Sequence, residues 1–476
     1  MKHHINYTML CDFYELTMGN GYLRSGMGDR ICYFDLFFRS VPDGGGFAIA
    51  AGLDRVVEYI QNLSFDEEDI AYLRGKDCFS EEFLDYLKNF RFTGDIWAVP
   101  EGTPIFPNEP ILTVRATAIQ AQFIETFLLL TVNHQSLIAT KSNRIVRAAQ
   151  GRPVSEFGSR RAQGADGALS GARASYIAGA SGTACTLADL WYGCPAGGTM
   201  AHSWVQMFDD EYTAFKTYCQ LYPNAATLLV DTYNVLKSGV PNAIKAFKEC
   251  GITKCAIRID SGDLTYLSKK ARKMLDEAGL TECKIMASNS LDEYIIRDLL
   301  VQGAQIDGFG VGERLITSKS EPVFGGVYKL AAVEDETGAV IPKIKISENA
   351  AKITTPHFKK VYRLFDKETG KAEADLLTLY DEVIDETQPL EIFDPAQTWK
   401  RKVLTNFTAK PLLEPIFLKG ELVYKQPTIE ESRTYCAAQV ATLWDEVKRF
   451  ENPHNYYVDL SQKLWDIKQS LLRKRP

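Results

Sequence analysis

The sequence has none of the features that mark exported, membrane-spanning or disulfide-stabilised proteins. Its first residues contain no apolar core of the kind that a secretory signal needs, so we expect a protein that stays in the cytoplasm. The most apolar run, at 127–130, is far shorter than the ~20 residues of a membrane-spanning helix. The ten cysteines contain no C-x-x-C pair, so neither a disulfide framework nor a zinc site is expected.

Clustered positive charge is also missing. The chain carries 54 Lys and Arg against 61 Asp and Glu, and its two basic runs, at 400–402 and 473–475, are short. Nucleic-acid binding needs a larger basic surface, so no nucleic-acid partner is predicted. The six histidines are dispersed apart from His3 and His4, and no local metal site emerges. No Walker A pattern occurs, so any ATP must be held by another kind of phosphate site.

The length of 476 residues corresponds to about three domains. Residues 1–134 mix helical patterns with short apolar runs separated by prolines, which indicates an α+β domain. Residues 135–345 alternate strand-like and helical runs, which is typical of a parallel α/β domain. Residues 346–476 show strand and helix patterns without obvious chemistry, and we expect a smaller appended domain.

The middle segment contains six strand-like apolar runs with helical patterns between most of them. The runs cover residues 154–157, 227–230, 255–259, 284–287, 307–311 and 328–333. The helical patterns cover residues 203–222, 234–249, 264–278 and 291–302. Polar, charged or glycine residues follow almost every run, as in an α/β barrel, where all strand ends share one rim. The pattern favours this barrel over an open doubly wound sheet, which has fewer convergent ends.

A stretch of small residues at 197–201 leads to His202 at the start of the first helical pattern. Ser203 is the expected N-cap of that helix. His202 would then lie beside free backbone N–H groups and the positive end of the helix, which suits a phosphate group. An isolated histidine at such a place is more often an ordinary surface residue, so this interpretation depends on the rest of the rim.

The remaining rim residues suit an anionic, phosphorylated sugar. Its arginines are Arg160, Arg161 and Arg258, and their guanidinium groups can donate paired hydrogen bonds to a carboxylate or a phosphate. The glycine turn at 310–312 can offer backbone N–H groups to a phosphate. Asp260 and Asp263 can accept from sugar hydroxyls or hold Mg²⁺ through water, although an Asp-Ser-Gly turn is also a common helix cap.

Five stretches of the chain resemble the nicotinate phosphoribosyltransferase family. They are residues 157–164 (FGSRRAQG), 198–203 (GTMAHS), 230–233 (VDTY), 258–264 (RIDSGDL) and 325–330 (GGVYKL). Residues 12–18 and 46–53 are similar to the N-terminal domain of that family. These specific motifs follow the family order across most of the chain.

The resemblance implies an N-terminal α+β sandwich domain, an incomplete α/β barrel and a C-terminal extension. It implies transfer of phosphoribosyl from phosphoribosyl pyrophosphate to nicotinate, which yields nicotinate mononucleotide and pyrophosphate in NAD salvage. ATP is then a co-substrate that phosphorylates His202, as in an ATP-dependent ligase, and Mg²⁺ binds the pyrophosphate. Family members are homodimers with shared active sites.

The resemblance also implies a role for each site residue. The catalytic residues are His202, Asp260 and Asp231, and the two carboxylates stabilise the positive charge that develops on the ribose. The expected nicotinate-binding residues are Tyr14 from the partner subunit, Phe157, Arg160, Thr199 and Arg258. The expected phosphoribosyl- and phosphate-binding residues are Ser261, Gly262, Asp263, Gly310, Gly312, Glu313 and Lys329. No protein ligand of a metal is assigned, and Asp231 or Asp260 is expected to orient His202.

Several alternatives stay open at this point. Related nicotinamide-using enzymes carry an acidic residue before the histidine motif, whereas residues 192–197 here contain none, so a carboxylate substrate fits better. A quinolinate-using enzyme would be shorter and would lack the His202 motif. A catalytically silent barrel that acts as a binding module is a third possibility. Glu313 replaces a threonine common in the family, and residues 184–185 replace a Ser-Asn pair.

Overall fold

The structure is a computed structural model that describes residues 6–474. The His3–His4 pair and residue 475 of the second basic run lie outside this range. The chain divides into two compact units. Unit 1 combines residues up to 137 with residues from 323 onward, and unit 2 comprises residues 138–322. Residues 323–345 of the predicted barrel segment therefore belong to unit 1, and the division into three domains stays a prediction.

The largest sheet of unit 1 has seven strands in the order β13-β12-β1-β5-β3-β19-β20, and every neighbouring pair is antiparallel. Its strands are β1 (Ile31–Phe37), β3 (Asp95–Ala98), β5 (Leu112–Thr117), β12 (Val327–Glu334), β13 (Val340–Pro342), β19 (Glu414–Leu418) and β20 (Glu421–Leu422). Strands from both ends of the chain thus share one sheet, because the apolar residues of β19 belong to the same core as those of β1 and β5.

A second sheet of unit 1 has four strands in the order β18-β14-β15-β21. These strands are β14 (Lys359–Asp366), β15 (Ala372–Leu379), β18 (Phe407–Pro411) and β21 (Val458–Leu460). Two small antiparallel pairs complete the strands: β2 (Ala48–Ile49) with β4 (Pro104–Ile105), and β16 (Leu390–Phe393) with β17 (Arg401–Leu404). The Lys359 ammonium on β14 lies 2.6 Å from the Asp35 carboxylate on β1, and both side chains are buried.

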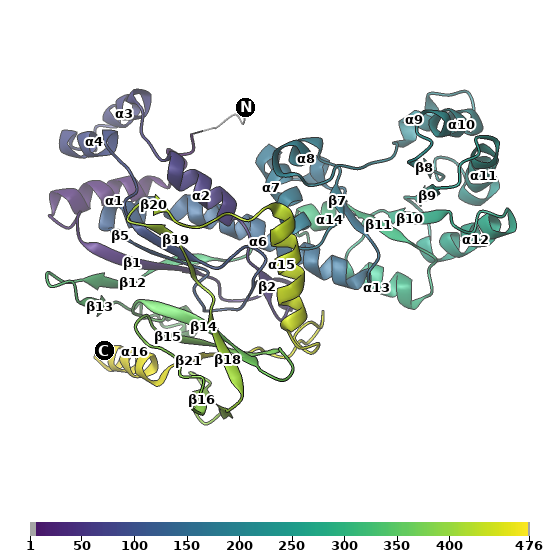
Figure 1. Cartoon of the computed structure of the whole chain (residues 1–476). Coiled ribbons are helices and arrows are strands. Elements are labelled where there is room, and N and C mark those ends of the chain that lie inside the picture. Colours follow the sequence, from purple (N-terminus) through teal and green to yellow (C-terminus); the bar gives the residue numbers. More distant parts are fainter. Residues whose placement is uncertain (1–5, 475–476) are drawn as a thin grey trace. The chain divides into compact units, whose positions relative to one another are not determined.

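Helices α1 to α4 lie on the side of the seven-stranded sheet opposite to the four-stranded sheet, whereas α16 lies beside the four-stranded sheet (Figure 1). The helices of unit 1 are α1 (Phe13–Arg24), α2 (Leu53–Asn62), α3 (Glu67–Arg74), α4 (Glu81–Lys88), α5 (Ala118–Phe123), α15 (Ile429–Thr442) and α16 (Gln462–Arg473). The long helix α6 (Glu125–Ala148) contains the boundary between the two units.

Unit 2 is built on a six-stranded sheet in which every pair of strands is parallel. The order is β7-β6-β11-β10-β9-β8. Apart from β7 and β8, strands that are neighbours in the sequence pair with each other, and β11 also pairs with β6, which is the circular order of an α/β barrel. The circle lacks only the pairing between β7 and β8. The predicted incomplete barrel is confirmed.

The strands of this half-barrel are β6 (Val154–Glu156), β7 (Gly182–Thr183), β8 (Ala226–Leu229), β9 (Cys255–Ile259), β10 (Lys284–Ser288) and β11 (Gly308–Val311). Its helices are α7 (Gly164–Ile177), α8 (Thr186–Tyr192), α9 (His202–Gln206), α10 (Glu211–Leu221), α11 (Val240–Glu249), α12 (Leu264–Glu277), α13 (Glu293–Val301) and α14 (Glu313–Ile316). On β9, Cys255, Ile257 and Ile259 are buried, while Arg258 alternates with them on the opposite face. Helices α11 and α12 pack along β9 (Figure 1).

Three expectations about the middle segment are wrong. The run 328–333 is not a barrel strand but the core of β12, which pairs with β1 in unit 1. The helical pattern 203–222 is two helices, because the carboxylate of Asp210 accepts from the backbone N–H of Thr213 at 2.8 Å and starts α10 anew. Ser203 is not the N-cap of α9, since Ala201 occupies that position and His202 is the first helical residue.

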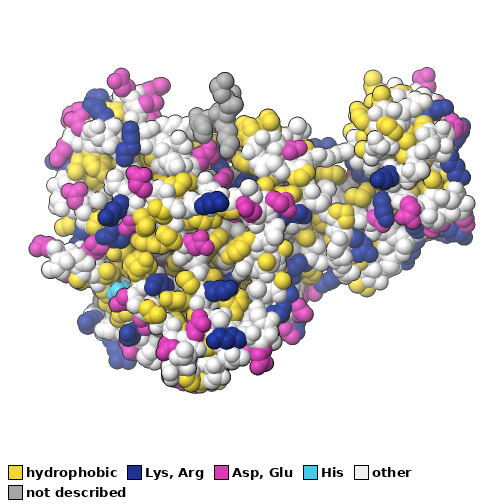
Figure 2. All heavy atoms as spheres, viewed as in Figure 1, with side chains coloured by type: hydrophobic (Ala, Val, Ile, Leu, Met, Phe, Trp, Pro, Cys, Tyr) yellow, Lys and Arg dark blue, Asp and Glu magenta, His cyan; other side chains and the backbone are white. Residues whose placement is uncertain are grey.

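The surface mixes charges of both signs. Figure 2 shows acidic and basic side chains interspersed over the visible face, without a broad stripe of one sign. Among residues 6–474, no helix is both long and apolar enough to span a membrane. In the same range, no cluster of three or more His, Cys, Asp or Glu side chains is arranged to hold a metal ion.

Candidate active site

The predicted site residues gather at one end of the half-barrel, with two exceptions. Tyr14 and Lys329 lie in unit 1, and all others lie in unit 2. Most of the unit 2 residues lie at strand ends: Phe157 and Arg160 after β6, Asp231 after β8, Arg258 to Asp263 at the end of β9, and Gly310 to Glu313 at the end of β11. Thr199 and His202 lie in the segment between β7 and β8. Because parallel strands end at the same edge, these groups share one rim.

Arg258 and Thr199 are in direct polar contact at the rim. The Nη1 group of Arg258 donates to the Thr199 hydroxyl at 2.7 Å, and the Tyr218 hydroxyl donates to the Thr199 carbonyl at 3.2 Å. The Nε–H of Arg258 is buried and has no hydrogen-bond partner. Burial lowers the pKa of Arg258, and the nearby Asp260 and Asp231 oppose that shift. The arginine thus keeps an unused donor in a site that is largely shielded from water.

Asp231 holds the loop that follows β9. Its Oδ2 atom accepts from the backbone N–H of Asp260 at 3.1 Å and from the hydroxyl of Ser261 at 2.5 Å. Its Oδ1 atom is buried and accepts no hydrogen bond. The hydroxyl of Ser288, at the end of β10, donates to Oδ1 of Asp260. The two carboxylates therefore have different surroundings: Asp231 supports the backbone, and Asp260 faces the open rim.

The imidazole of His202 lies between a hydroxyl and a carboxylate. Its Nδ1 atom is 3.1 Å from the Thr232 hydroxyl, and its Nε2 atom is 3.9 Å from Oδ2 of Asp260. The side chain is 41% exposed, which leaves room for a reacting group. Of the two candidate carboxylates, Asp260 is the one beside the ring. Thr232 was missed in the sequence, although it lies inside the VDTY stretch directly after Asp231.

Phe157 occupies space that two glycines leave free. Its ring lies against Gly310, where an added Cβ atom would be 2.4 Å from the ring carbon Cδ2. At Gly312 the nearest atom to an added Cβ would be the Phe157 carbonyl oxygen, at 3.2 Å. The backbone N–H of Phe157 also donates to Val311 at 2.8 Å. Both glycines therefore have a packing reason beside their predicted part in phosphate binding.

Glu156, the last residue of β6, directly precedes Phe157 and was missed by sequence reasoning. It is fully buried, its Oε2 atom accepts from the Thr183 hydroxyl at 2.7 Å, and its Oε1 atom accepts from the backbone N–H of Gly158. Burial raises the pKa of Glu156. The only signal in the sequence is a single glutamate in an apolar strand, which weakly indicates a buried carboxylate that accepts hydrogen bonds.

Three of the residues predicted to bind phosphate also have a structural role in the loops that they occupy. The Asp263 carboxylate caps α12 by accepting from the backbone N–H of Tyr266 at 2.8 Å. Gly262 has φ +80°, a backbone conformation that glycine adopts readily. The Glu313 carboxylate lies 2.5 Å from the Lys319 ammonium, and this hydrogen bond lowers the pKa of Glu313. The Glu313 side chain is therefore paired with a lysine and, as a carboxylate, offers no hydrogen-bond donor to a phosphate.

Tyr14 and Lys329 in unit 1 share one acidic neighbour. The Lys329 ammonium lies 3.9 Å from the Glu125 carboxylate. Burial lowers the pKa of Lys329, and Glu125 opposes that shift. Burial and then Glu125 raise the pKa of Tyr14, whose side chain is exposed on α1. Tyr14, Lys329 and Glu125 thus form one cluster of ionisable side chains on unit 1.

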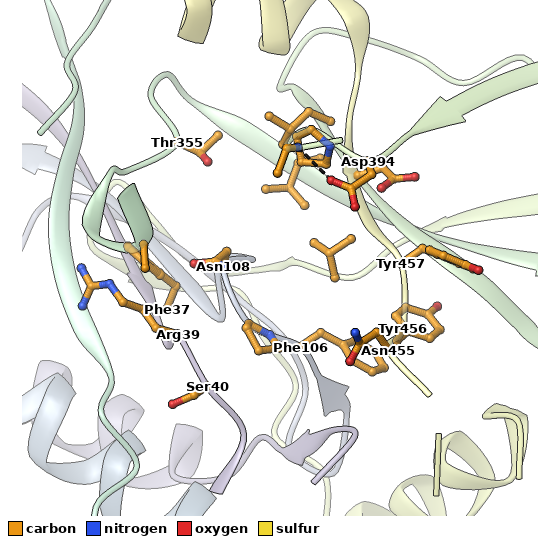
Figure 3. A pocket seen from close by; sticks show the side chains of 18 of the residues that line it. Phe37, Arg39, Ser40, Phe106, Asn108, Thr355, Asp394, Asn455, Tyr456 and Tyr457 are labelled. Atoms are coloured by element: carbon orange, nitrogen blue, oxygen red, sulfur yellow. Dashed lines mark hydrogen bonds between the residues drawn. The ribbon is translucent and has the colours of Figure 1, made fainter. Parts of the chain in front are cut away.

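Unit 1 also contains a cavity of about 1230 Å³ that includes none of the predicted site residues. Figure 3 shows side chains from β1, the 106–108 turn and the segment before β21 around it, with Phe106 and Tyr456 side by side. Their rings stack at a centroid distance of 3.8 Å. Asp459 in the wall is 4% exposed. Burial and the neighbouring Asp394 raise the pKa of Asp459 to about 6.

A parallel half-barrel with arginine, aspartate and histidine side chains gathered at the carboxyl ends of its strands has the architecture of an α/β-barrel enzyme. The chain belongs to the nicotinate phosphoribosyltransferase family. The model of that family's N-terminal domain matches residues 9–133, and the model of its C-terminal domain matches residues 358–468. The resemblance seen in the motifs is confirmed.

Individual relatives cover nearly the whole chain. The nicotinate phosphoribosyltransferase of Bacillus subtilis is 45% identical over 97% of this chain and 94% of its own length. The human enzyme of the same name is 30% identical over 97% of this chain and 96% of its own length. The crystal structure of human nicotinic acid phosphoribosyltransferase superposes with a TM-score of 0.85 at 29% identity, and covers 97% of this chain and 100% of the human chain.

Proposed function

We propose that this enzyme transfers phosphoribosyl from phosphoribosyl pyrophosphate to the ring nitrogen of nicotinate, and that ATP hydrolysis drives the transfer through phosphorylated His202. The products are nicotinate mononucleotide and pyrophosphate, and the reaction belongs to NAD salvage in the cytoplasm. One observation carries the proposal: Arg258 with its bound Thr199, the Asp231–Asp260 pair and His202 meet at one rim.

Nicotinate recognition rests on Arg258. A guanidinium group binds a planar carboxylate through two parallel hydrogen bonds, and Arg258 has a buried Nε–H without a partner. Thr199 keeps the guanidinium in place by accepting from Nη1. The Phe157 ring supplies an aromatic face for the pyridine ring, and the exposed Arg160 adds positive charge nearby. The uncharged amide of nicotinamide has one acceptor oxygen and no negative charge to match the guanidinium, which supports nicotinate over nicotinamide.

Energy coupling rests on the environment of His202. A histidine that accepts a phosphoryl group needs a neutral ring with one nitrogen free. With the Nδ1–H donated to the Thr232 hydroxyl, the lone pair of Nε2 is available to attack the terminal phosphorus of ATP. The bond from that phosphorus to the bridging oxygen then breaks, and ADP leaves. Asp260, 3.9 Å from Nε2, stabilises positive charge on the ring.

The transfer step rests on the two aspartates. Departure of pyrophosphate leaves positive charge on the ribose, and the Asp260 carboxylate stabilises that charge. Mg²⁺ bound to the pyrophosphate would neutralise the charge of the leaving group. Oxygen ligands suit this ion, and the buried, unpartnered Oδ1 of Asp231 together with Asp260 fits it. Ser261, Gly262 and Asp263, with the glycine turn at 310–312, supply hydroxyl and backbone groups for the ribose and its 5-phosphate.

We further propose that the active enzyme is a homodimer in which Tyr14 and Lys329 of one subunit complete the rim of the other. Both residues lie on unit 1 beside Glu125, and Tyr14 is exposed. A tyrosine ring and an ammonium group are the partners that a pyridine ring and a phosphate require.

A product assay tests this function. The protein is incubated with phosphoribosyl pyrophosphate, Mg²⁺ and nicotinate, nicotinamide or quinolinate, each with and without ATP, and mononucleotides and ADP are quantified. We expect nicotinate mononucleotide alone, with turnover raised by ATP. Equal turnover of nicotinamide would disprove the role of Arg258 in selection. Absence of any mononucleotide would favour a binding module.

A further inference from the structure

Four of the ten cysteines gather at the amino ends of β9 and β10, away from the rim. They are Cys219 in α10, Cys250 at the end of α11, Cys255 at the start of β9 and Cys283 directly before β10. Cys250 and Cys255 contribute to the raised pKa of Cys219, after burial, so these thiols are near one another. The proposed reaction uses none of them.

The strand register places Cys255 and Cys283 side by side. Lys284 on β10 pairs with Ala256 on β9, so the preceding residue of each strand, Cys283 and Cys255, lies on the same face. Adjacent strands are ~4.8 Å apart, which falls within the ~4.4–6.8 Å between Cα atoms that a disulfide spans. The two thiols also share a hydrogen bond. A bond between their sulfur atoms therefore needs no rearrangement of the strands.

The surroundings differ between the two thiols: the charge of Arg272 acts on both, and the carboxylate of Asp307 acts on Cys283 as well. The guanidinium of Arg272 donates to the carbonyls of Cys283 at 2.5 Å and Leu280 at 2.7 Å. The hydrogen bond from Cys283, followed by the charge of Arg272, lowers the pKa of Cys255, while the same hydrogen bond raises the pKa of Cys283. Cys255 is 6% exposed and Cys283 is 1% exposed. Cys255 is therefore the more nucleophilic and the more accessible thiol.

We propose that Cys255 and Cys283 are an oxidation site, at which a small hydroperoxide converts two thiols into an intramolecular disulfide. The Cys255 thiolate attacks one oxygen of hydrogen peroxide, the O–O bond breaks, and a sulfenic acid forms on Cys255. The hydroxide that leaves takes up the proton released by the Cys255 thiol and becomes water. The sulfur of Cys283 then attacks the Cys255 sulfur, and the hydroxyl group leaves as a second water with the Cys283 proton. Both sulfur atoms are oxidised by one electron each, and the peroxide is reduced.

The site lies on the two strands that position the proposed active residues. Arg258 and Asp260 follow Cys255 along β9, and Ser288, which binds Asp260, ends β10. Cys255 and Asp260 are five positions apart, or roughly 16 Å at the rise of a strand. The disulfide therefore forms at the opposite end of the strands from the rim, and its formation can be measured without any assay of catalysis.

The test is to treat the folded full chain with hydrogen peroxide, block free thiols, digest the protein without reductant and map the peptides by mass spectrometry. We expect a linked pair of peptides that contains Cys255 and Cys283, lighter by two hydrogens than the separate peptides and released by dithiothreitol. The exposed Cys78 is an internal reference for peroxide exposure. Oxidised Cys78 beside free thiols at both positions would overturn the proposal.

Two variants separate this pair from its neighbours. Cys283→Ser should remove the link and leave a sulfenic acid on Cys255 that dimedone traps. Cys219→Ser is the matched control, because Cys219 is also buried beside Cys255, and the link should form in it as in the unmodified chain. A disulfide between Cys255 and Cys219 in the unmodified chain would contradict the proposed pair. That peptide map decides the question even where a variant fails to fold.

Discussion

Arg258 is the side chain that we propose to bind the carboxylate of nicotinate. In Arg258→Ala, we expect kcat/KM for nicotinate to fall about 10- to 100-fold, since a hydrogen bond to a charged group contributes ~1.5–3 kcal/mol. The smaller activity with nicotinamide should change little. Steady-state kinetics with both bases measure this, and Arg74→Ala, at an exposed arginine of α3, is the control. An equal loss for both bases would show that Arg258 does not read the carboxylate.

His202 should separate energy coupling from transfer. In His202→Ala, we expect loss of acid-labile phosphate on the protein and of the stimulation by ATP, with slow ATP-independent transfer remaining. Thr232→Val should weaken the coupling in the same direction, because it removes the hydroxyl that contacts Nδ1, whereas Thr232→Ser should retain it. Labelling of the protein with ATP that carries a labelled γ-phosphate measures its phosphorylation in each variant. His454→Ala, at an exposed histidine of unit 1, is the control. Undiminished labelling of His202→Ala would place the phosphoryl acceptor elsewhere.

Asp459 makes the stability of unit 1 depend on pH. Burial and Asp394 raise its pKa from 3.8 to about 6, so the folded state holds the proton more tightly than the unfolded state. This contribution to stability is present below pH 3.8 and is lost as the pH rises to about 6. Asp459→Asn should therefore raise the free energy of unfolding above pH 6, by at most about 3 kcal/mol before solvent screening reduces it. Urea denaturation between pH 4 and pH 8 measures this, and a uniform change across that range would contradict it.

Among the elements, α13 is held to α6 by a buried carboxylate. The Glu293 side chain is 0% exposed and contacts the Lys141 ammonium at 2.9 Å and the Arg144 guanidinium at 2.8 Å. Removing one partner of a buried ion pair costs ~3–5 kcal/mol, so Glu293→Gln should lower the free energy of unfolding by about that amount. Glu277→Gln is the control, because its pair with Lys273 is exposed and should matter by less than ~1 kcal/mol. Equal melting temperatures for Glu293→Gln and the unmodified chain would show that Glu293 does not stabilise the packing of α13 on α6.

Elements with strong local signals were predicted well. The strands β8 to β11 followed from apolar runs with turn residues at their ends, and their parallel pairing followed from the helices between them. The two-residue strand β7 was missed because its pairing with β6 is a tertiary contact, not a local pattern. The break between α9 and α10 depends on a single side-chain cap at Asp210, which competes with a continuous helical pattern.

For the whole molecule, the C-terminal segment belongs to unit 1, where it forms the four-stranded sheet and also adds strands to the seven-stranded sheet. Strand β19 pairs with β3 inside the seven-stranded sheet, and Leu460 and Leu464 belong to the same core as β1. A chain truncated after residue 345 should therefore aggregate, because an apolar core face and an unpaired strand edge become exposed. Size-exclusion chromatography and thermal melting measure this against the full chain. A monodisperse fragment with an unchanged melt would show that residues 346–476 form an independent domain.

The sequence by itself determined the family, the parallel half-barrel and the positions of the rim residues, because these follow from local patterns and from motifs in a set order. Tertiary structure alone decided three further features: the place of β12 in the sheet of unit 1, the Thr232 contact of His202, and the pairing of Cys255 with Cys283. Each of them joins residues far apart in the chain. Local propensity carries no information about such contacts, since only the register of the folded sheets brings those residues together.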